Sequence, residues 1–535
     1  MAQKKIGELL IEEGFINDEY ISFALKEQES TGDRVGDILV RLGIVTDAEV
    51  ATVLAKQSKK DFVDLTDFSF DKKVLETIPI SFTRQYTVLP LSNDNGIFRI
   101  AVSDPFDIKI PELVARFTND TINISVAANS QIKKLIERGH YLLEHPVAEE
   151  INRMVETLKR NENAPINVEH LTELIISSAI NNRATDIHIT PTNKTMHISY
   201  RIDGVLQLFY TLPVSVHSRI VSAIKVSSGM DIAEQRKPQD GRMSFSLAGE
   251  KFDLRVSTML TSFGENTVLR ILTRSAALYS MNTLGFSVSD CEKIKNLFKK
   301  PFGIIIVCGP TGSGKTTTLY AILRQVNAIE KNILTVEDPI EYTFPLVRQT
   351  QVNVRAGITF ASAARHFLRQ DPDVMLIGET RDIETAQIAI RASMTGHLVF
   401  STLHTNDAAG TMPRLLDLGV NNYLIGSSLL GVIAQRLVRK ICPYCKEEII
   451  KDGKKSYRGK GCERCNFTGY LGRIVIGEIL IVTEKIAQMI IDNTPLYEIK
   501  KQAQQEGMTT LLEDAMEKVK TGITTTEEVE RVVGI

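Results

Sequence analysis

The stretch GIIIVCGPTGSGKTTT at residues 303–318 decides the fold of the segment that contains it. It begins with a continuous apolar run, typical of a strand buried on both faces, and ends in residues that open a helix. Between them, Gly309, Gly314, Lys315 and Thr316 have the spacing of a phosphate-binding loop. Because both flanking elements are those that such a loop requires, we predict a nucleoside triphosphate site here.

The residue types of this loop suit contact with phosphate. Glycines let backbone N–H groups close around the phosphates, and the helix N-terminus adds a partial positive charge. We expect Lys315 to reach the outer phosphates and the Thr316 hydroxyl to coordinate Mg²⁺. The predicted ATP contacts are Gly309, Pro310, Thr311, Gly312, Ser313, Gly314, Lys315, Thr316 and Thr317.

Three further apolar runs alternate with helical stretches after the loop: NILTVED (332–338), DVMLIGE (373–379) and HLVFSTLH (397–404). Continuous apolar strands separated by helices predict an α/β domain with a mostly parallel sheet covered on both faces. Glu379 ends one strand and is our choice for activating water, and Glu337 ends another as a second catalytic acid. The adjacent Asp338 fits a loop or helix cap equally well.

His397 and His404 bracket the third of these runs. A single histidine at a strand end is most often a hydrogen-bonded structural residue. Because this pair brackets a strand of the P-loop sheet, we also predict that each senses the γ-phosphate during catalysis.

Composition limits the classes of function. Hydrophobic residues make up 43% and charged residues 24% of the chain, and the formal net charge is -2. These values are ordinary for globular proteins and give no overall reason to bind nucleic acid or anionic lipid. The N-terminus carries charges where a signal peptide needs an apolar core, and no run approaches the roughly 18 apolar residues of a membrane helix. We therefore expect a cytoplasmic protein.

The chain begins with an internal repeat, in which residues 5–28 realign with residues 34–57 at an offset of 29. Each copy predicts two helices joined at a glycine, so the repeat should form a small helical bundle. At 535 residues the chain is long enough for three to five domains. We expect a helical repeat module at 1–62, an α+β subdomain at 63–145, a linker at 146–168, an α+β domain with a half-exposed antiparallel sheet at 169–278, and the P-loop domain at 279–535, which ends in helices at 484–535.

Several motifs together resemble the secretion ATPase superfamily, and its type IV pilus assembly and type II secretion branch above all. They include its Asp box, its glutamate motif and its His box, and they continue into the preceding domain. The matching segments are VEDPIEY (336–342), LRQDPDVMLIGETRD (368–382), TGHLVFSTLHTNDA (395–408), ATDIHITP (184–191), YRIDGV (200–205), KPQDGR (237–242) and RVSTMLTSFGENTVLRIL (255–272). The resemblance implies a RecA-like P-loop core preceded by a PAS-like α+β domain.

The same resemblance implies a homo-hexameric ATP hydrolase at the cytoplasmic face of the bacterial inner membrane. It would work with an inner-membrane platform protein and associated cytoplasmic-ring proteins, without spanning the membrane and without nucleic acid. Arginines of the preceding domain complete the nucleotide site in this family, and Arg201, Arg255 and Arg270 fall in the matching motifs; a surface ion pair is the other reading for each. Pilus assembly and type II secretion both remain open, as does a less favoured nucleic-acid motor.

Four cysteines form two pairs, Cys442 with Cys445 and Cys462 with Cys465, separated by 16 residues. This spacing predicts a structural Zn²⁺ site, since four thiolates complete a tetrahedron without an open position. A reduced cluster without metal is the alternative. We expect the basic segment between the pairs to be a solvated loop.

The N-terminal repeat resembles the module with which a subset of these ATPases binds cyclic di-GMP. The corresponding residues are Lys5, Gly7, Gln28, Arg34, Gly36 and Gln57. Lys5 stands where arginine is usual, and lysine lacks the planar fork that reads a guanine edge. Binding of cyclic di-GMP and a packed docking module for a membrane partner therefore both remain open.

Overall fold

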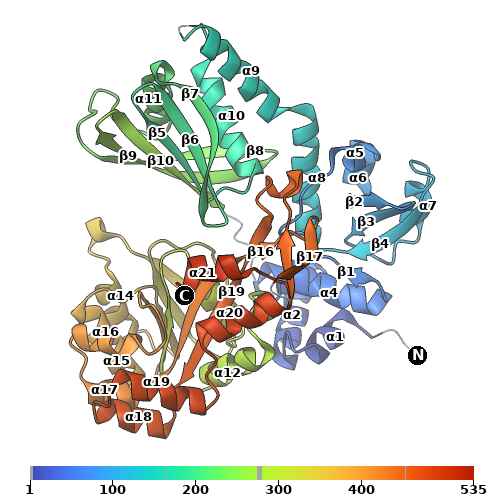
Figure 1. Cartoon of the computed structure of the whole chain (residues 1–535). Helices are drawn as coiled ribbons and strands as arrows, with labels where there is room; N and C mark the ends of the chain where they lie inside the picture. Colours follow the sequence, from blue (N-terminus) through green and yellow to red (C-terminus); the bar gives the residue numbers. More distant parts are fainter. Residues whose placement is uncertain (1–3, 163, 274–279, 452–453, 535) are drawn as a thin grey trace. The chain divides into compact units, whose positions relative to one another are not determined.

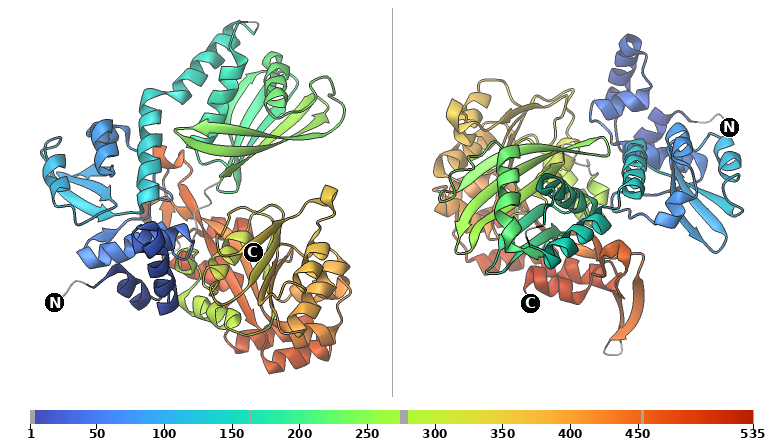
Figure 2. Two further views of the ribbon diagram at one scale, coloured as in Figure 1. Left: turned by 180° about the vertical axis from the view of Figure 1, so that it is seen from behind. Right: turned by 90° about the horizontal axis from the view of Figure 1, so that it is seen from above.

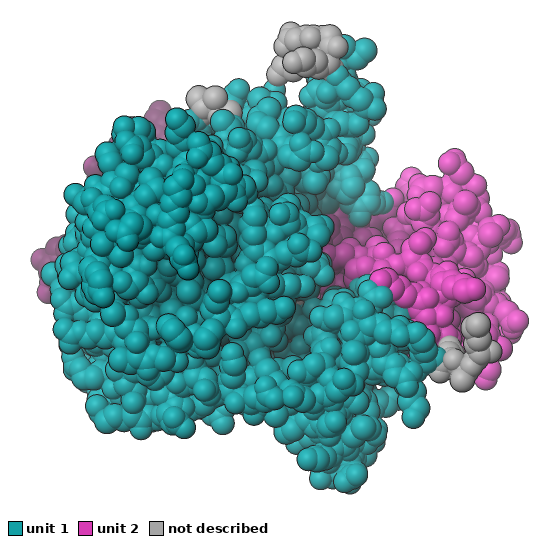
Figure 3. Space-filling view, turned by 90° about the horizontal axis from the view of Figure 1, so that it is seen from below, with its two compact units in different colours: residues 1–54, 277–535 teal, residues 55–276 magenta. Residues whose placement is uncertain are grey.

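The computed structural model describes residues 4–162, 164–273, 280–451 and 454–534, which form two compact units. One unit combines residues 1–54 with residues 277–535, and the other contains residues 55–276; Figure 3 colours them separately. The N-terminal helices therefore pack with the P-loop domain, although more than 200 residues of chain separate the two segments.

A seven-stranded sheet forms the core of the first unit, in the order β13-β12-β14-β15-β11-β16-β19 (Figure 1). All neighbouring strands are parallel except β16 and β19, which confirms the mostly parallel sheet expected from the apolar runs. The strands are β11 (Gly303–Cys308), β12 (Ile333–Glu337), β13 (Arg348–Gln351), β14 (Val374–Ile377), β15 (Leu398–Leu403), β16 (Leu429–Ile441) and β19 (Tyr470–Ile481).

Helices cover both faces of this sheet because alternate residues of its strands point to opposite sides. In β11, Ile304 and Ile306 join the core beneath α14 to α19, whereas Ile305 and Val307 join the core beneath α12 and α13. The helices are α12 (Val288–Phe298), α13 (Lys315–Leu323), α14 (Phe360–Phe367), α15 (Ile383–Met394), α16 (Thr411–Asp417), α17 (Asn422–Ser428), α18 (Glu484–Ile491) and α19 (Leu496–Gln505), with 3-10 turns at Met281–Thr283 and Val354–Ala356.

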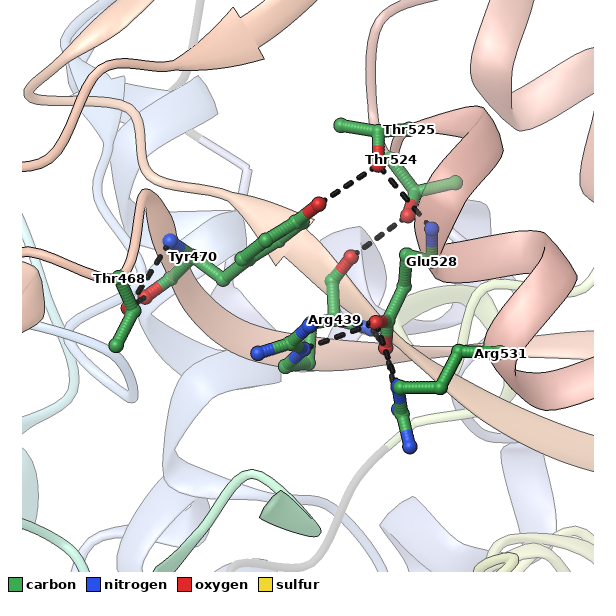
Figure 4. Close-up of polar contacts among 7 residues, drawn as sticks. All are labelled: Arg439, Thr468, Tyr470, Thr524, Thr525, Glu528 and Arg531. Carbon is green, nitrogen blue, oxygen red and sulfur yellow. Dashed lines mark hydrogen bonds and ion pairs between the residues drawn. The ribbon is translucent and has the colours of Figure 1, made fainter. Parts of the chain in front are cut away.

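The last two helices, α20 (Leu511–Lys520) and α21 (Thr526–Val533), pack against β16 and β19. Figure 4 shows the polar contacts that anchor α21, in which the fully buried carboxylate of Glu528 accepts from Arg439 and Arg531. Burial by itself would raise the pKa of Glu528, but the two guanidinium groups lower it below its ordinary value. The helical C-terminus expected from the sequence is therefore fastened to the central sheet.

Both copies of the N-terminal repeat fold as a pair of helices. They are α1 (Ile6–Glu12) with α2 (Asp18–Thr31), and α3 (Val35–Arg41) with α4 (Asp47–Ser58). Gly14 and Gly43 follow the first helix of each copy with φ near 70°, a backbone conformation that glycine adopts without strain. Leu10, Ile38 and Leu39 are fully buried in the core that the two copies share.

The second unit contains a four-stranded sheet in the order β1-β4-β3-β2 and a six-stranded antiparallel sheet in the order β7-β6-β5-β10-β9-β8. Helices α9, α10 and α11 pack on one face of the larger sheet (Figure 2). The segment 146–168, expected to be a linker, begins with the helix α9, whose Ile151 and Leu158 are buried in the core of this unit.

The smaller sheet consists of β1 (Asp61–Phe62), β2 (Val88–Asp94), β3 (Ile97–Val102) and β4 (Thr121–Val126), with α5 (Lys72–Glu76), α6 (Ile80–Tyr86), α7 (Lys109–Val114) and α8 (Asn129–Glu144). The larger consists of β5 (Asp186–Pro191), β6 (Thr195–Ile202), β7 (Val205–Pro213), β8 (Gln239–Leu247), β9 (Glu250–Thr261) and β10 (Gly264–Thr273), with α9 (Val147–Arg160), α10 (Val168–Asn181), α11 (His217–Ser227) and a 3-10 turn at Val214–Val216.

The basic segment between the two cysteine pairs forms a hairpin of β17 (Lys446–Lys451) and β18 (Lys454–Gly459), and not the expected solvated loop. Opposite charges face each other across its strands, with Glu447 beside Arg458 and Glu448 beside Lys455. Such cross-strand pairs stabilise a hairpin, and the sequence reading missed them because it considered only the net charge. Within the described residues, the helices are all too short or too polar to cross a membrane.

Candidate functional site

The phosphate-binding loop lies between β11 and α13, as the sequence predicts. Gly314 immediately precedes α13 with φ of 87°, in the left-handed region that favours glycine. A side chain at Gly309 would meet the backbone oxygen of Gln435 at 2.4 Å, so only glycine fits there. The loop therefore depends on its glycines both for its turn and for its close approach to β16.

Lys315 and Thr316 open α13 at the mouth of the loop. The Lys315 Nζ donates to the carbonyl oxygens of Gly309 at 2.8 Å and Pro310 at 3.1 Å. Burial lowers the pKa of this amine, while the nearby carboxylate of Glu379 counteracts that effect. The half-buried Thr316 follows directly, and its hydroxyl is the kind of hard oxygen ligand that Mg²⁺ prefers.

Glu379 lies two residues beyond β14, at the same edge of the sheet as the loop. Its carboxylate lies 2.6 Å from the Arg381 guanidinium and 3.1 Å from Nε2 of His404, which directly follows β15. Burial alone would raise the pKa of Glu379, but Arg381, His404 and Lys315 lower it below its ordinary value. Glu379 is therefore ionised at neutral pH and can accept a hydrogen bond from a water molecule.

The ring of His404 is held in its neutral form. Burial and the positive charge of Lys315 lower its pKa below the ordinary value of 6.5, although the Glu379 carboxylate acts in the opposite direction. A neutral imidazole has a single N–H donor, so the Nε2–H of His404 can donate either to the Glu379 carboxylate or to a phosphate oxygen, and not to both at once.

Glu337 has quite different surroundings, although it ends the neighbouring strand β12. Its carboxylate is buried and accepts hydrogen bonds from the Thr335 hydroxyl at 2.6 Å, from the Gln349 amide at 3.0 Å, and from the Tyr320 hydroxyl. Tyr320 belongs to α13, so these contacts tie Glu337 to the helix that begins with Lys315. Asp338, one residue later, is exposed.

The structure does not bring His397 to this site. His397 precedes β15 whereas His404 follows it, so a six-residue strand separates the two. The Nδ1 atom of His397 lies 2.9 Å from the carbonyl oxygen of Ala392 and 3.2 Å from the Thr395 hydroxyl. These contacts fit the structural reading that the sequence left open for His397.

The far end of α13 is held by the N-terminal helices. Arg324, just beyond α13, forms a buried ion pair with Glu49 of α4 and also donates to the carbonyl oxygens of Gly43 and Ile44. The Tyr20 hydroxyl of α2 accepts from the backbone N–H of Ala328 at 3.1 Å. The helix behind the phosphate-binding loop is thus fixed from its far end by both copies of the repeat.

A row of charged residues crosses the six-stranded sheet of the second unit. Direct cross-strand pairing aligns five positions on five adjacent strands, in the order Arg201, Asp186, Arg270, Arg255 and Arg242. Directly paired residues share one face of a sheet. The neighbouring Ile187, Leu254 and Leu269 point into the core instead, so the arginine row lies on the face opposite the helices.

A cavity of about 470 Å³ lies over this row, and Arg242, Arg255, Arg270, Asp186 and Asp240 line it. Arg270 donates to Asp186 at 2.9 Å, and Arg201 lies 3.9 Å from the same carboxylate. One carboxylate thus orients two of the predicted arginines. Arg242 was not among the predicted site residues, although its motif KPQDGR was noted and the alternation of β8 could have placed it on this face.

The four cysteines come together as the spacing predicts. Their sulfur atoms all lie within 4.8 Å of one another, with separations of 3.9 Å between Cys442 and Cys462, 3.9 Å between Cys445 and Cys465, and 3.7 Å between Cys462 and Cys465. A tetrahedron with Zn–S bonds of about 2.3 Å has edges of about 3.8 Å. The thiolates therefore fit Zn²⁺.

The predicted cyclic di-GMP residues occupy matching places in the two copies of the repeat. Lys5 and Arg34 each stand immediately before the first helix of their copy. Gly7 packs against Ile21, whose side chain leaves no room for a Cβ atom, whereas the Gln28 amide donates to the carbonyl oxygen of Asp33. The two copies thus present a lysine and an arginine at equivalent positions.

Sequence comparison places most of the chain in one family. Residues 160–531 match the family described as "Type II/IV secretion system protein", and residues 59–142 match the "MshEN domain". The chain is 36% identical to the type IV pilus assembly ATPase PilB of Myxococcus xanthus over 557 positions, covering 98% of each protein. It is also 46% identical to the type II secretion system ATPase E of Vibrio cholerae over 399 positions, covering 72% of this chain and 79% of that protein.

Structural comparison agrees at the level of the fold. The crystal structure of the ATPase DotB from Yersinia pseudotuberculosis superposes with a TM-score of 0.53 at 22% identity, covering 69% of this chain and 95% of DotB. The family match extends over well over half of the chain, across both the arginine row and the phosphate-binding loop. The chain belongs to the type II/IV secretion system protein family.

Proposed function

We propose that this chain is an ATP hydrolase that powers the assembly of type IV pili. The observation that carries the proposal is the meeting of Glu379, His404 and Lys315 at the sheet edge where the phosphate-binding loop lies. A relative named as a type IV pilus assembly ATPase aligns with 98% of this chain. The work would be done by a homo-hexamer at the cytoplasmic face of the inner membrane, pushing on a platform protein.

The residues of the loop divide the chemistry among them. The loop N–H groups and Lys315 would bind the phosphates, and Thr316 would hold Mg²⁺, which would supply further positive charge to the bound nucleotide. Glu379 accepts a hydrogen bond from the attacking water and orients it toward the γ-phosphorus. His404, neutral at pH 7, has a single N–H, and this donor can turn from the Glu379 carboxylate to the γ-phosphate. Arg381 keeps Glu379 ionised between turnovers.

The arginine row would add positive charge to the nucleotide site, as the resemblance to the secretion ATPases implies. Arg201, Arg255 and Arg270, with the additional Arg242, present planar donors on the open face of the sheet. Such groups stabilise the charge that develops on a transferring phosphoryl group. Replacing Arg255 with alanine should lower kcat more than it raises the Kd for ADP, and an equal effect on both would contradict this role.

Two further ligands belong to the proposal. Zn²⁺ would hold Cys442, Cys445, Cys462 and Cys465 together and fix the base of the hairpin. Metal analysis should find one zinc ion per chain, and Cys442→Ser should abolish zinc binding.

Cyclic di-GMP would bind the N-terminal repeat through Arg34 and Lys5. Calorimetric titration with cyclic di-GMP should show binding, and Arg34→Ala should raise its Kd. If the wild-type protein gives no heat of binding, the repeat does not bind cyclic di-GMP, and the alternative of a docking module for a membrane partner is favoured.

Type II secretion is the second candidate function, because the secretion relative is more similar over the part that aligns, at 46% identity. The deciding experiment places Glu379→Gln at the native locus. Loss of surface pili with a normal culture supernatant supports pilus assembly, whereas retained pili with a depleted supernatant supports secretion. No change in either contradicts both functions.

A further inference from the structure

The phosphate-binding loop rests on strand β16, the neighbour of β11 on the side away from β15. Cys308, the last residue of β11, pairs with Ala434. Gln435 is therefore the next residue of β16, level with the start of the loop. Its side chain is fully buried, although glutamine is seldom found inside proteins.

Gln435 contacts the loop through both its backbone and its side chain. Its amide Nε2 donates to the carbonyl oxygen of Ser313 at 2.7 Å. A Cβ atom at Gly314 would lie 3.3 Å from the same nitrogen, and one at Gly309 would meet the backbone oxygen of Gln435. Gln435 thus touches the beginning and the end of the glycine-rich turn.

The bond to Ser313 has a directional consequence for the next peptide group. A trans peptide is planar, so the carbonyl of one residue and the N–H of the following residue point in opposite directions. The carbonyl of Ser313 points toward β16, where its oxygen accepts the hydrogen bond from the Gln435 amide. The N–H of Gly314 must therefore point away from β16.

The other end of the Gln435 amide makes no competing contact. Its Oε1 is buried and has no hydrogen-bond partner among the residues that the structure describes. A buried acceptor without a partner is unfavourable, and an apolar side chain of the same size would avoid that cost. The hydrogen bond that Nε2 donates to the loop is therefore the reason for a glutamine, and not an apolar residue, at this buried position.

We propose that Gln435 is a positioning residue for nucleotide binding, which aims the Gly314 N–H at the phosphates by holding the Ser313 carbonyl. The inference rests on the proposed function, since it requires that the loop binds nucleotide. It adds to the phosphate site a residue of β16 that lies outside the phosphate-binding loop motif. Without this bond the Ser313–Gly314 peptide group is free to rotate. Nucleotide binding must then also order the loop, and this entropic cost weakens the affinity.

The test replaces Gln435 with methionine, which keeps the length and removes the donor. The control is Gln131→Met in the other unit, where the glutamine amide accepts from the backbone N–H of Leu65 and donates to the Thr66 hydroxyl. Titration of the full-length protein with fluorescent ADP should show that Gln435→Met raises the Kd about tenfold, as expected for one lost hydrogen bond. Gln131→Met should leave the Kd unchanged, and a wild-type Kd for Gln435→Met overturns the inference.

A second variant, Gln435→Glu, keeps the shape of the side chain and makes the donor depend on pH. An ionised carboxylate repels the Ser313 carbonyl, whereas a protonated one donates to it, and burial raises the pKa of such a group. The ratio of variant to wild-type Kd should therefore fall toward one as the pH is lowered from 8 to 6, which a general packing defect would not produce. A ratio that does not change with pH overturns the inference. Failure of the wild-type protein to bind ADP would instead contradict the proposed function.

Discussion

Two glutamates end neighbouring strands of the central sheet, yet they lie in opposite kinds of surroundings. Glu337 is 3% exposed, and the donors to its carboxylate among the described residues are all neutral. The Glu379 side chain is 18% exposed, and it lies among the cationic groups of Arg381 and Lys315 and the ring of His404. The carboxyl ends of β12 and β14 are thus equivalent in topology and different in charge.

The difference indicates how the two acids divide the work. A carboxylate saturated by internal hydrogen bonds has little capacity left for water, whereas one at the open edge beside Lys315 can meet both water and phosphate. We infer that Glu379 acts on the reacting groups. Glu337 acts through Tyr320, by fixing the helix that begins with Lys315.

The largest expected effect is that of Glu379→Gln. The amide keeps the shape and removes the negative charge that orients water, so kcat should fall about 100- to 10,000-fold. The Kd for ATP should stay close to that of the wild type, since the phosphate contacts come from the loop. Steady-state phosphate release and equilibrium binding measure the two quantities, and a kcat within threefold of wild type would contradict the role of Glu379.

Glu337→Gln should act more weakly and in a different way. Its new NH₂ group would replace either the oxygen that accepts from the Tyr320 hydroxyl or the oxygen that accepts from Thr335 and Gln349, so at least one of these buried hydrogen bonds is lost, at a cost of about 1–3 kcal/mol. We expect kcat to fall about tenfold and the hydrogen exchange of α13 to become faster. Tyr320→Phe should reproduce part of both changes. Loss of turnover as complete as in Glu379→Gln, with unchanged exchange, would show that Glu337 takes part in the chemistry directly.

The pH dependence of turnover tests the role of His404, which lies beside Glu379 and not beside Glu337. The pKa of His404 is lowered, so the folded protein favours the neutral ring; the stability that this ring contributes is present above pH 6.5 and is lost as the pH falls through the lower folded pKa. A protonated ring would pair with Glu379 and withdraw it from water. We expect the acidic limb of kcat/KM to lie below pH 6.5 and to be abolished by His404→Asn. A limb that persists in the variant must belong to another group.

The smallest expected effect on activity comes from the far end of α13. Glu49→Gln leaves the buried Arg324 without its counter-charge, which costs about 3 kcal/mol in the docking of the N-terminal helices. Hydrogen exchange of α3 and α4 should become faster, while kcat changes less than about threefold. Glu19→Gln, which weakens an exposed contact with Asn327, is the matched control and should leave the exchange of α3 and α4 unchanged.

The sequence predicted best what is local along the chain. The loop between β11 and α13 and the cluster of four cysteines were predicted in full because short, fixed spacings define them, and the positions of Glu379 and His404 at one sheet edge because both residues follow apolar strands. The burial of Glu337 could not be predicted, since its donors Tyr320 and Gln349 come from segments whose relative placement only the fold determines. Gln435 was missed for the same reason, since it contacts the loop from a neighbouring strand, whereas the alternation of β8 could have placed Arg242 beside the predicted arginines.

The most direct test of the division between the two acids is a single-turnover measurement. Enzyme in excess over radiolabelled ATP is mixed with Mg²⁺ and quenched at successive times, for wild type, Glu379→Gln and Glu337→Gln. We expect Glu379→Gln to hold ATP uncleaved with wild-type affinity, and Glu337→Gln to cleave its bound ATP at a rate much nearer to that of the wild type. Cleavage that is slower in Glu337→Gln than in Glu379→Gln would contradict this division.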